Sequence, residues 1–104
     1  GRQLDGAPSS IRALPRIVSA VGNDIEVWMD GGIRSGQDIL RAWALGARGV
    51  LIGRPYIYGL GAYGEAGVTR ALEILYNEMD ITMAFTGHRN IQNVTRDILV
   101  EGTY

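Results

Sequence analysis

Two short apolar segments in this chain each run directly into glycine and arginine. Residues 25–29 (IEVWM) lead into DGGIR at residues 30–34, and residues 49–52 (GVLI) lead into GRP at residues 53–55. The second segment is apolar throughout, which is typical of a strand buried on both faces of a parallel sheet. Both segments are shorter than an ordinary helix, so we predict a strand at each.

A helical pattern precedes the first predicted strand. After Ser9 and Ser10, apolar residues recur at helical spacing from Ile11 to Val21, and Gly22 closes the pattern. Pro15 lies inside this pattern, and a proline beyond the first turn removes a backbone hydrogen bond. We therefore expect the helix to start late, near Arg12, or to kink.

A second helix is predicted between the two strands, over residues 36–45. Ser35 and Asp38 have the spacing of a capping box at its start, and Gly46 lies just past its end.

After the second strand, a short aromatic turn at residues 56–60 precedes a long helical pattern over residues 65–86, which Gly87 ends. A weak helical signal follows Thr95. The order of helix, strand, helix, strand, helix predicts βα units with a parallel sheet. Two strands alone cannot bury both faces of a parallel sheet or close a barrel, so we expect residues 1–104 to be part of a larger domain.

The composition excludes several classes of function. Ten arginines, no lysine and eleven acidic residues give a net charge of −1, which does not indicate a nucleic-acid or membrane surface. No cysteine is present, so disulfides and thiolate metal sites are excluded. No apolar run approaches the roughly 20 residues that a transmembrane helix needs. We expect a cytoplasmic protein without a metal site, and we interpret the start at Gly1, rather than Met, as a truncation.

The two glycine–arginine junctions predict a phosphate site. Glycines let a ligand approach the backbone closely, helix N-termini supply N–H donors, and Arg34 and Arg54 add permanent forked charges. In a (β/α)₈ barrel, the loops after strands seven and eight and a short extra helix often build such a site, and residues 56–60 fit that helix. Asp30 is anionic, so it suits a ligand hydroxyl or the anchoring of a neighbouring loop. The alternative is that the glycines only turn the chain and the arginines are solvated.

Longer motifs resemble a known family. The stretches DGGIRSGQD (residues 30–38), ALGA (44–47) and GR (53–54) resemble the phosphate end of several FMN-binding and phosphate-binding barrels, including IMP dehydrogenase. GRQLDG at residues 1–6 and YGLGA at residues 58–62 resemble more specifically the FMN-dependent 2-hydroxy acid dehydrogenases and oxidases. The resemblance runs across nearly the whole chain. It implies an α/β fold, namely the C-terminal βα units of a (β/α)₈ TIM barrel that is incomplete here.

The resemblance also implies roles for individual residues. Arg2 would bind the carboxylate of an L-2-hydroxy acid, with L-lactate as the first candidate substrate, and Asp30 would contact the ribityl chain of FMN. The FMN phosphate would be held by Gly31, Gly32, Arg34, Gly53 and Arg54.

The resemblance places the catalytic histidine outside this chain, in a His-Gly-Gly-Arg run just upstream of Gly1. His88 is the only histidine present, and its position after the long helix indicates a helix-end role instead. The lysine that the family places near the flavin ring is also absent. We therefore expect the isolated fragment to be inactive. The parent protein, from which the fragment comes, is expected to be a homo-oligomeric oxidoreductase that is cytoplasmic or peripheral to the inner membrane face. An IMP dehydrogenase-like barrel and a catalytically silent scaffold fragment remain as alternatives.

Overall fold

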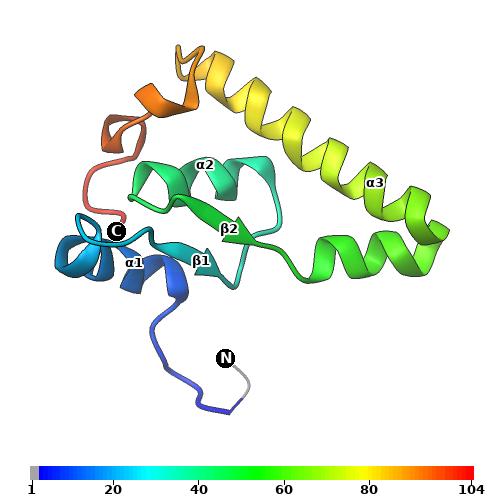
Figure 1. Cartoon of the computed structure of the whole chain (residues 1–104), viewed down its shortest axis with the longest axis horizontal. Helices are drawn as coiled ribbons and strands as arrows, with labels where there is room; N and C mark the ends of the chain where they lie inside the picture. The colour runs from blue at the N-terminus through cyan, green and yellow to red at the C-terminus, as the bar shows by residue number, and fades with distance from the viewer. Residues whose placement is uncertain (1–2) are drawn as a thin grey trace.

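Two parallel strands and three helices form the fold of this computed structural model, which describes residues 3–104 (Figure 1). The elements in chain order are α1 (Ser10–Val21), β1 (Trp28–Asp30), α2 (Gly36–Ala44), β2 (Gly49–Leu51) and α3 (Arg54–Phe85), followed by the 3₁₀ turns η1 (Ile91–Asn93) and η2 (Arg96–Ile98). The strands pair in parallel, with Asp30 opposite Leu51. The predicted βα order and parallel sheet are therefore confirmed, although both strands are shorter than predicted.

The main hydrophobic core lies where α1 and α2 pack against the sheet. Leu14 of α1, Met29 of β1 and Ala42 of α2 belong to one buried cluster. The side chains before and after Met29 are exposed, and Leu51 of β2 is 47% exposed. This exposure agrees with the expectation that two strands alone cannot bury both faces of the sheet, because the described helices build a core against one face only.

Helix α1 begins at Ser10 and continues through Pro15, so the expected late start is wrong. The N–H groups of Arg12 and Ala13 both donate to the Ser9 carbonyl, at 3.0 and 3.1 Å, which establishes the first turn ahead of the proline. A proline at this position removes only one N–H donor from the helix, and the apolar face of α1 remains packed.

Helix α3 consists of two helical segments joined at a sharp bend, with the longer segment running back past α2 (Figure 1). The bend falls at Tyr63 and Gly64, and Gly64 adopts a positive φ of 59°. The predicted turn after the second strand is thus a helical segment longer than predicted, and the predicted long helix is the second segment. At the bend the two segments touch, since a Cβ on Gly67 would overlap the Gly59 backbone.

We expect the Gly67→Ala substitution to destabilise the fold by about 1–3 kcal/mol, because the added methyl group must push the two segments of α3 apart. Gly61→Ala is the matched control: it lies in the same helix, but its Cβ would meet nothing within 4 Å. Both variants are made in the full-length gene product, the complete polypeptide that contains residues 1–104. Urea unfolding measures the free energy of unfolding of each. Equal stability of the two variants would contradict the close contact.

The C-terminal segment closes a second, smaller core. Val94 packs with Leu40 and Ala44 of α2 and Met83 of α3. The weak helical signal after Thr95 corresponds to η2. Among the helices of residues 3–104, none combines the length and the apolar character needed to cross a bilayer.

Candidate phosphate-binding site

The loops that follow β1 and β2 meet at one pocket. Because the strands are parallel and in register, their carboxyl ends lie at the same edge of the sheet. The pocket has a volume of about 280 Å³ and is lined by Asp30, Gly31, Gly32, Ile33, Arg34, Leu51, Gly53 and Arg54. The structure therefore brings together all the residues predicted at the two glycine–arginine junctions, and both arginines line the same cavity.

The loop from β1 to α2 is shaped by two consecutive glycines and one buried side chain. Gly31 and Gly32 have φ values of 96° and 82°, a conformation that residues with a Cβ rarely adopt. A Cβ on Gly31 would also come within 2.8 Å of Ser10 Oγ. Ile33 is only 3% exposed and packs in the main core, so it anchors the loop while Arg34 remains exposed.

The loop from β2 to α3 leads directly into a helix N-terminus. Gly53 is the N-cap of α3, Arg54 is the first helical residue and Pro55 follows, where its fixed φ suits a helix start. A Cβ on Gly53 would meet nothing within 4 Å. This glycine therefore leaves open space above the strand end, which is what a ligand approaching the backbone requires.

Asp30 holds its own loop. Its Oδ1 accepts a hydrogen bond from the Gly31 N–H at 2.7 Å. This geometry matches one of the two predicted roles, the anchoring of a neighbouring loop, while contact with a ligand hydroxyl stays a prediction. The bond also engages the Gly31 N–H, so the Gly32 and Gly53 amides are the better candidates to donate to an anion.

The two helix N-termini beside the pocket differ in their free donors. At α2, the predicted capping box is present: Ser35 Oγ accepts from the Asp38 N–H, and the Asp38 carboxylate accepts from the N–H groups of Arg34 and Ser35. Glu78 accepts from the Gly36 N–H. At α3, no side chain within residues 3–104 accepts from the Gly53 or Arg54 N–H. The positive end of α3 is therefore the one open to an anion.

The sequence does not single out Glu78. A usable signal exists, because helical spacing puts this carboxylate on the α3 face that also carries buried Leu75 and partly buried Met79. A charged residue on a packed face needs a partner. The partner here lies 42 residues away in sequence, which no local pattern indicates.

Two further residues, Arg2 and His88, carry predictions of their own. Arg2 falls outside the described residues, so its predicted contact with substrate stays a prediction. His88 follows Gly87, which has a φ of 78°, and its N–H donates to the Met83 carbonyl at 2.8 Å. The expected helix-end role of His88 is confirmed, and His88 lines a separate cavity with Asp80 and Arg89.

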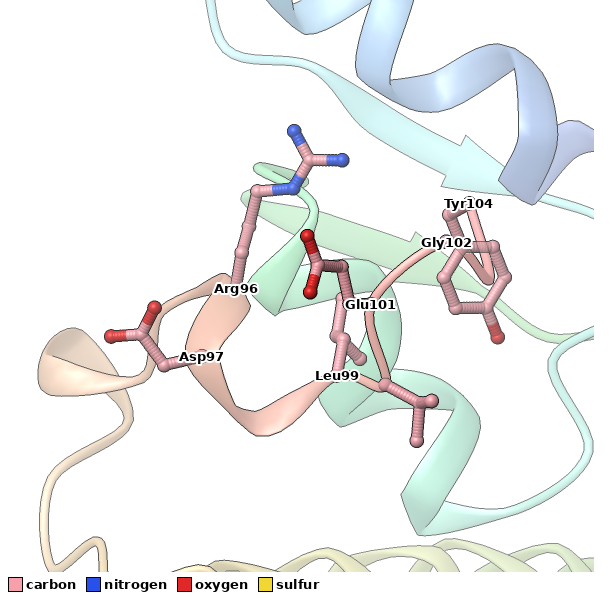
Figure 2. Close-up of a pocket in the computed structure, with 7 residues that line it drawn as sticks. Arg96, Asp97, Leu99, Glu101, Gly102 and Tyr104 are labelled. Atoms are coloured by element: carbon pink, nitrogen blue, oxygen red, sulfur yellow. The ribbon is translucent and has the colours of Figure 1, made fainter.

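A larger cavity of about 400 Å³ lies at the C-terminal segment (Figure 2). Arg96, Asp97 and Glu101 line it, so one cation stands beside two carboxylates. That balance does not suit a phosphate. Residues 3–104 contain no group of three or more histidine, aspartate or glutamate side chains that could hold a metal ion.

Comparison with known proteins decides the family. Residues 1–101 match the family model for FMN-dependent dehydrogenases. The chain belongs to this family. The match decides between the two barrel families that the sequence leaves open, in favour of the FMN-dependent 2-hydroxy acid enzymes over an IMP dehydrogenase-like barrel.

Relatives within the family agree with this assignment. An L-lactate dehydrogenase of Caulobacter vibrioides is 56% identical over 101 residues, covering 97% of this chain and 26% of the relative. A pre-mycofactocin synthase of Mycobacterium tuberculosis is 50% identical, covering 96% of this chain and 26% of the relative. This chain thus spans about a quarter of the length of the curated relatives it matches.

A solved structure of a mandelate oxidase mutant with an FMN adduct superimposes with a TM-score of 0.85 at 48% identity, covering 92% of this chain and 31% of that one. Such neighbours are TIM-barrel enzymes. The two strands and three helices of this chain are βα units of that barrel, which is incomplete here.

Proposed function

We propose that this chain is the flavin-phosphate-binding part of an oxidoreductase that converts an L-2-hydroxy acid, with L-lactate as the first candidate, to the 2-oxo acid through FMN. The observation that carries the proposal is the single pocket at the strand ends, where Arg34 and Arg54 stand with Gly32 and Gly53. Relatives named for L-lactate and mandelate chemistry support the substrate class.

The residues present fit the phosphate end of FMN. A phosphate monoester carries close to two negative charges at pH 7, about −1.5 to −2, and two exposed guanidinium groups can meet it with forked donors. Among the described residues 3–104, Asp30 is the only carboxylate lining the pocket, and its bond to the Gly31 N–H keeps one of its oxygens occupied. Its remaining lone pairs suit a ribityl hydroxyl, which is the donor next to the phosphate.

The chemistry needs groups beyond the phosphate pocket. When bound, FMN supplies the acceptor for the hydrogen removed from the substrate α-carbon. Within this chain, we propose that Arg2 orients the substrate by holding its carboxylate with two parallel hydrogen bonds. The proton acceptor is proposed to be a histidine upstream of Gly1, and no catalytic residue is assigned within residues 1–104. The isolated chain is accordingly proposed to be inactive.

The test uses the full-length gene product. The flavin released on denaturation is identified, and the native protein is mixed anaerobically with L-lactate, D-lactate and L-mandelate. We expect the flavin to be FMN and its visible absorbance to bleach with an L-2-hydroxy acid but not with D-lactate. Purified protein without flavin, or flavin that no 2-hydroxy acid reduces, would contradict the proposal.

A pre-mycofactocin synthase at 50% identity matches this chain nearly as well as the L-lactate dehydrogenase does. Similarity over this segment therefore does not select the substrate by itself. The substrate screen should extend beyond 2-hydroxy acids if FMN is bound and none of them reduces it.

We expect the Arg2→Lys substitution to lower kcat/KM for the hydroxy acid roughly 10- to 150-fold, which corresponds to a loss of about 1.5–3 kcal/mol in transition-state stabilisation. Lysine keeps the charge but lacks the planar fork that matches a carboxylate. Steady-state kinetics measure the effect, and Arg12→Lys, at an exposed position of α1, is the control. Unchanged kcat/KM would show that Arg2 does not contact the carboxylate.

A further inference from the structure

One hydrogen bond ties the first residue of helix α2, next to the loop that carries Arg34, to helix α3. Glu78 Oε2 accepts from the Gly36 N–H at 2.8 Å, across 42 residues of sequence. The other side-chain hydrogen bonds within residues 3–104 join residues no more than four positions apart. In this part of the chain, Glu78 thus makes the one side-chain hydrogen bond between separate elements.

Helices α2 and α3 approach each other closely at the same point. A Cβ on Gly36 would overlap the α3 backbone at Leu75 and Met79 and would lie 2.7 Å from the Glu78 carbonyl carbon. Gly36 is buried, while Glu78 is half-buried. The missing side chain at Gly36 lets its N–H come within reach of Glu78, so the hydrogen bond depends on this close approach.

This contact lies two residues from Arg34. The Asp38 carboxylate holds the N–H groups of Arg34 and Ser35, and Glu78 holds the next N–H along the chain. The stretch from Arg34 to Gly36 is therefore clamped by carboxylates from two different helices. Neither carboxylate lines the pocket itself.

Helix α3 consequently reaches both sides of the pocket. It begins at Arg54, one of the two arginines of the pocket. Its second segment carries Glu78, which binds Gly36, two residues after the other arginine, Arg34. We propose that Glu78 is a positioning residue for the flavin phosphate: by tying the start of α2 to α3, it sets where Arg34 stands relative to Arg54. This inference rests on the proposed function.

The competing explanation is that Glu78 only stabilises the packing of α2 on α3. The two explanations differ in what they predict for riboflavin, which has the flavin ring and ribityl chain but no phosphate. A positioning role weakens FMN binding and leaves riboflavin binding unchanged, whereas a general loss of packing weakens both.

The experiment measures dissociation constants for FMN and riboflavin by flavin fluorescence on the apo form of the full-length gene product. Glu78→Ala removes the acceptor, and Glu78→Asp draws the carboxylate back by one methylene while keeping its charge. Glu78→Gln keeps an oxygen acceptor at the same reach. Glu73→Gln, on the exposed face of α3 and paired with Arg70 in the wild type, is the matched control.

We expect Glu78→Ala and Glu78→Asp to weaken FMN binding about 10-fold with riboflavin binding unchanged, and Glu78→Gln and Glu73→Gln to bind FMN like wild type. If Glu78→Ala does not fold, the aspartate and glutamine variants carry the same comparison. Equal losses for FMN and riboflavin, loss of FMN affinity in Glu78→Gln, or no loss in Glu78→Asp would overturn the inference. Wild-type protein that binds FMN no better than riboflavin would contradict the proposed function itself.

Discussion

Replacing Arg34 and Arg54 together by alanine is expected to weaken FMN binding by about 3–6 kcal/mol, since each arginine loses a charge-assisted hydrogen bond of about 1.5–3 kcal/mol. Both side chains line the pocket at the strand ends, and both are exposed, so their removal leaves no cavity in the core. Riboflavin affinity should not change, because riboflavin has no phosphate for the guanidinium groups to bind. The free energy of unfolding should also stay unchanged, because both arginine side chains are exposed and leave no cavity.

The single variants and a control sharpen this test. The loss of about 3–6 kcal/mol is the sum for two independent arginines; because both would hold one phosphate, the difference between the double variant and the sum of the two single variants measures how far they couple. Arg70→Ala is the control, because Arg70 is exposed on α3, pairs with Glu73 and does not line the pocket. If the double variant keeps wild-type FMN affinity, or loses riboflavin affinity to the same degree, the pocket does not hold the phosphate.

The 104-residue polypeptide by itself is expected to associate and to lack activity. Its accessible surface is 7572 Å², whereas a compact monomer of 11.3 kDa exposes about 5,700 Å². Its radius of gyration of 14.7 Å also exceeds the roughly 13 Å of a compact domain of this length. The excess surface of about 1,800 Å² is more than twice what one partner buries in a typical interface, about 800 Å².

Much of that surface is apolar. Trp28 and Leu51 lie exposed on the sheet, and Tyr58, Leu72, Ile81 and Phe85 lie exposed along α3. Each strand of the two-stranded sheet also has an unpaired edge within the described residues, and such edges pair readily with other chains. We propose that these surfaces pack against an N-terminal barrel segment in the parent protein, and that the parent is a homo-oligomer.

Light scattering and a flavin absorbance scan on the 104-residue polypeptide test this expectation. We expect species larger than 11.3 kDa and no tight retention of FMN, because the pocket supplies only the phosphate end of a flavin site. Turnover of hydroxy acids is also expected to be absent. A monodisperse, yellow 11.3 kDa monomer that oxidises lactate would contradict both parts.

The sequence predicts the site better than it predicts the extent of the elements. It was predictable that the two glycine–arginine junctions form one site, because parallel strands bring their carboxyl ends to one edge of the sheet and the two loops that follow them meet there. The capping box at Ser35 and Asp38 was predictable because it is local in sequence. Each of these features depends on residues within a few positions of one another and on a general rule of sheet topology.

Other features depend on contacts that a sequence pattern does not contain. Pro15 does not delay the start of α1, because the first turn is established on Ser9 before the proline is reached. Leu51 is exposed because this chain supplies helices for only one sheet face. The role of Glu78 depends on the close approach of α3 to Gly36, a tertiary contact between residues 42 positions apart.

A crystal structure of the full-length gene product with FMN bound would test the phosphate pocket most directly. We predict the phosphate between the Arg34 and Arg54 guanidinium groups, accepting from the Gly32 and Gly53 amides, with a ribityl hydroxyl donating to Asp30. A phosphate bound elsewhere, with these two arginines turned to solvent, would contradict the assignment.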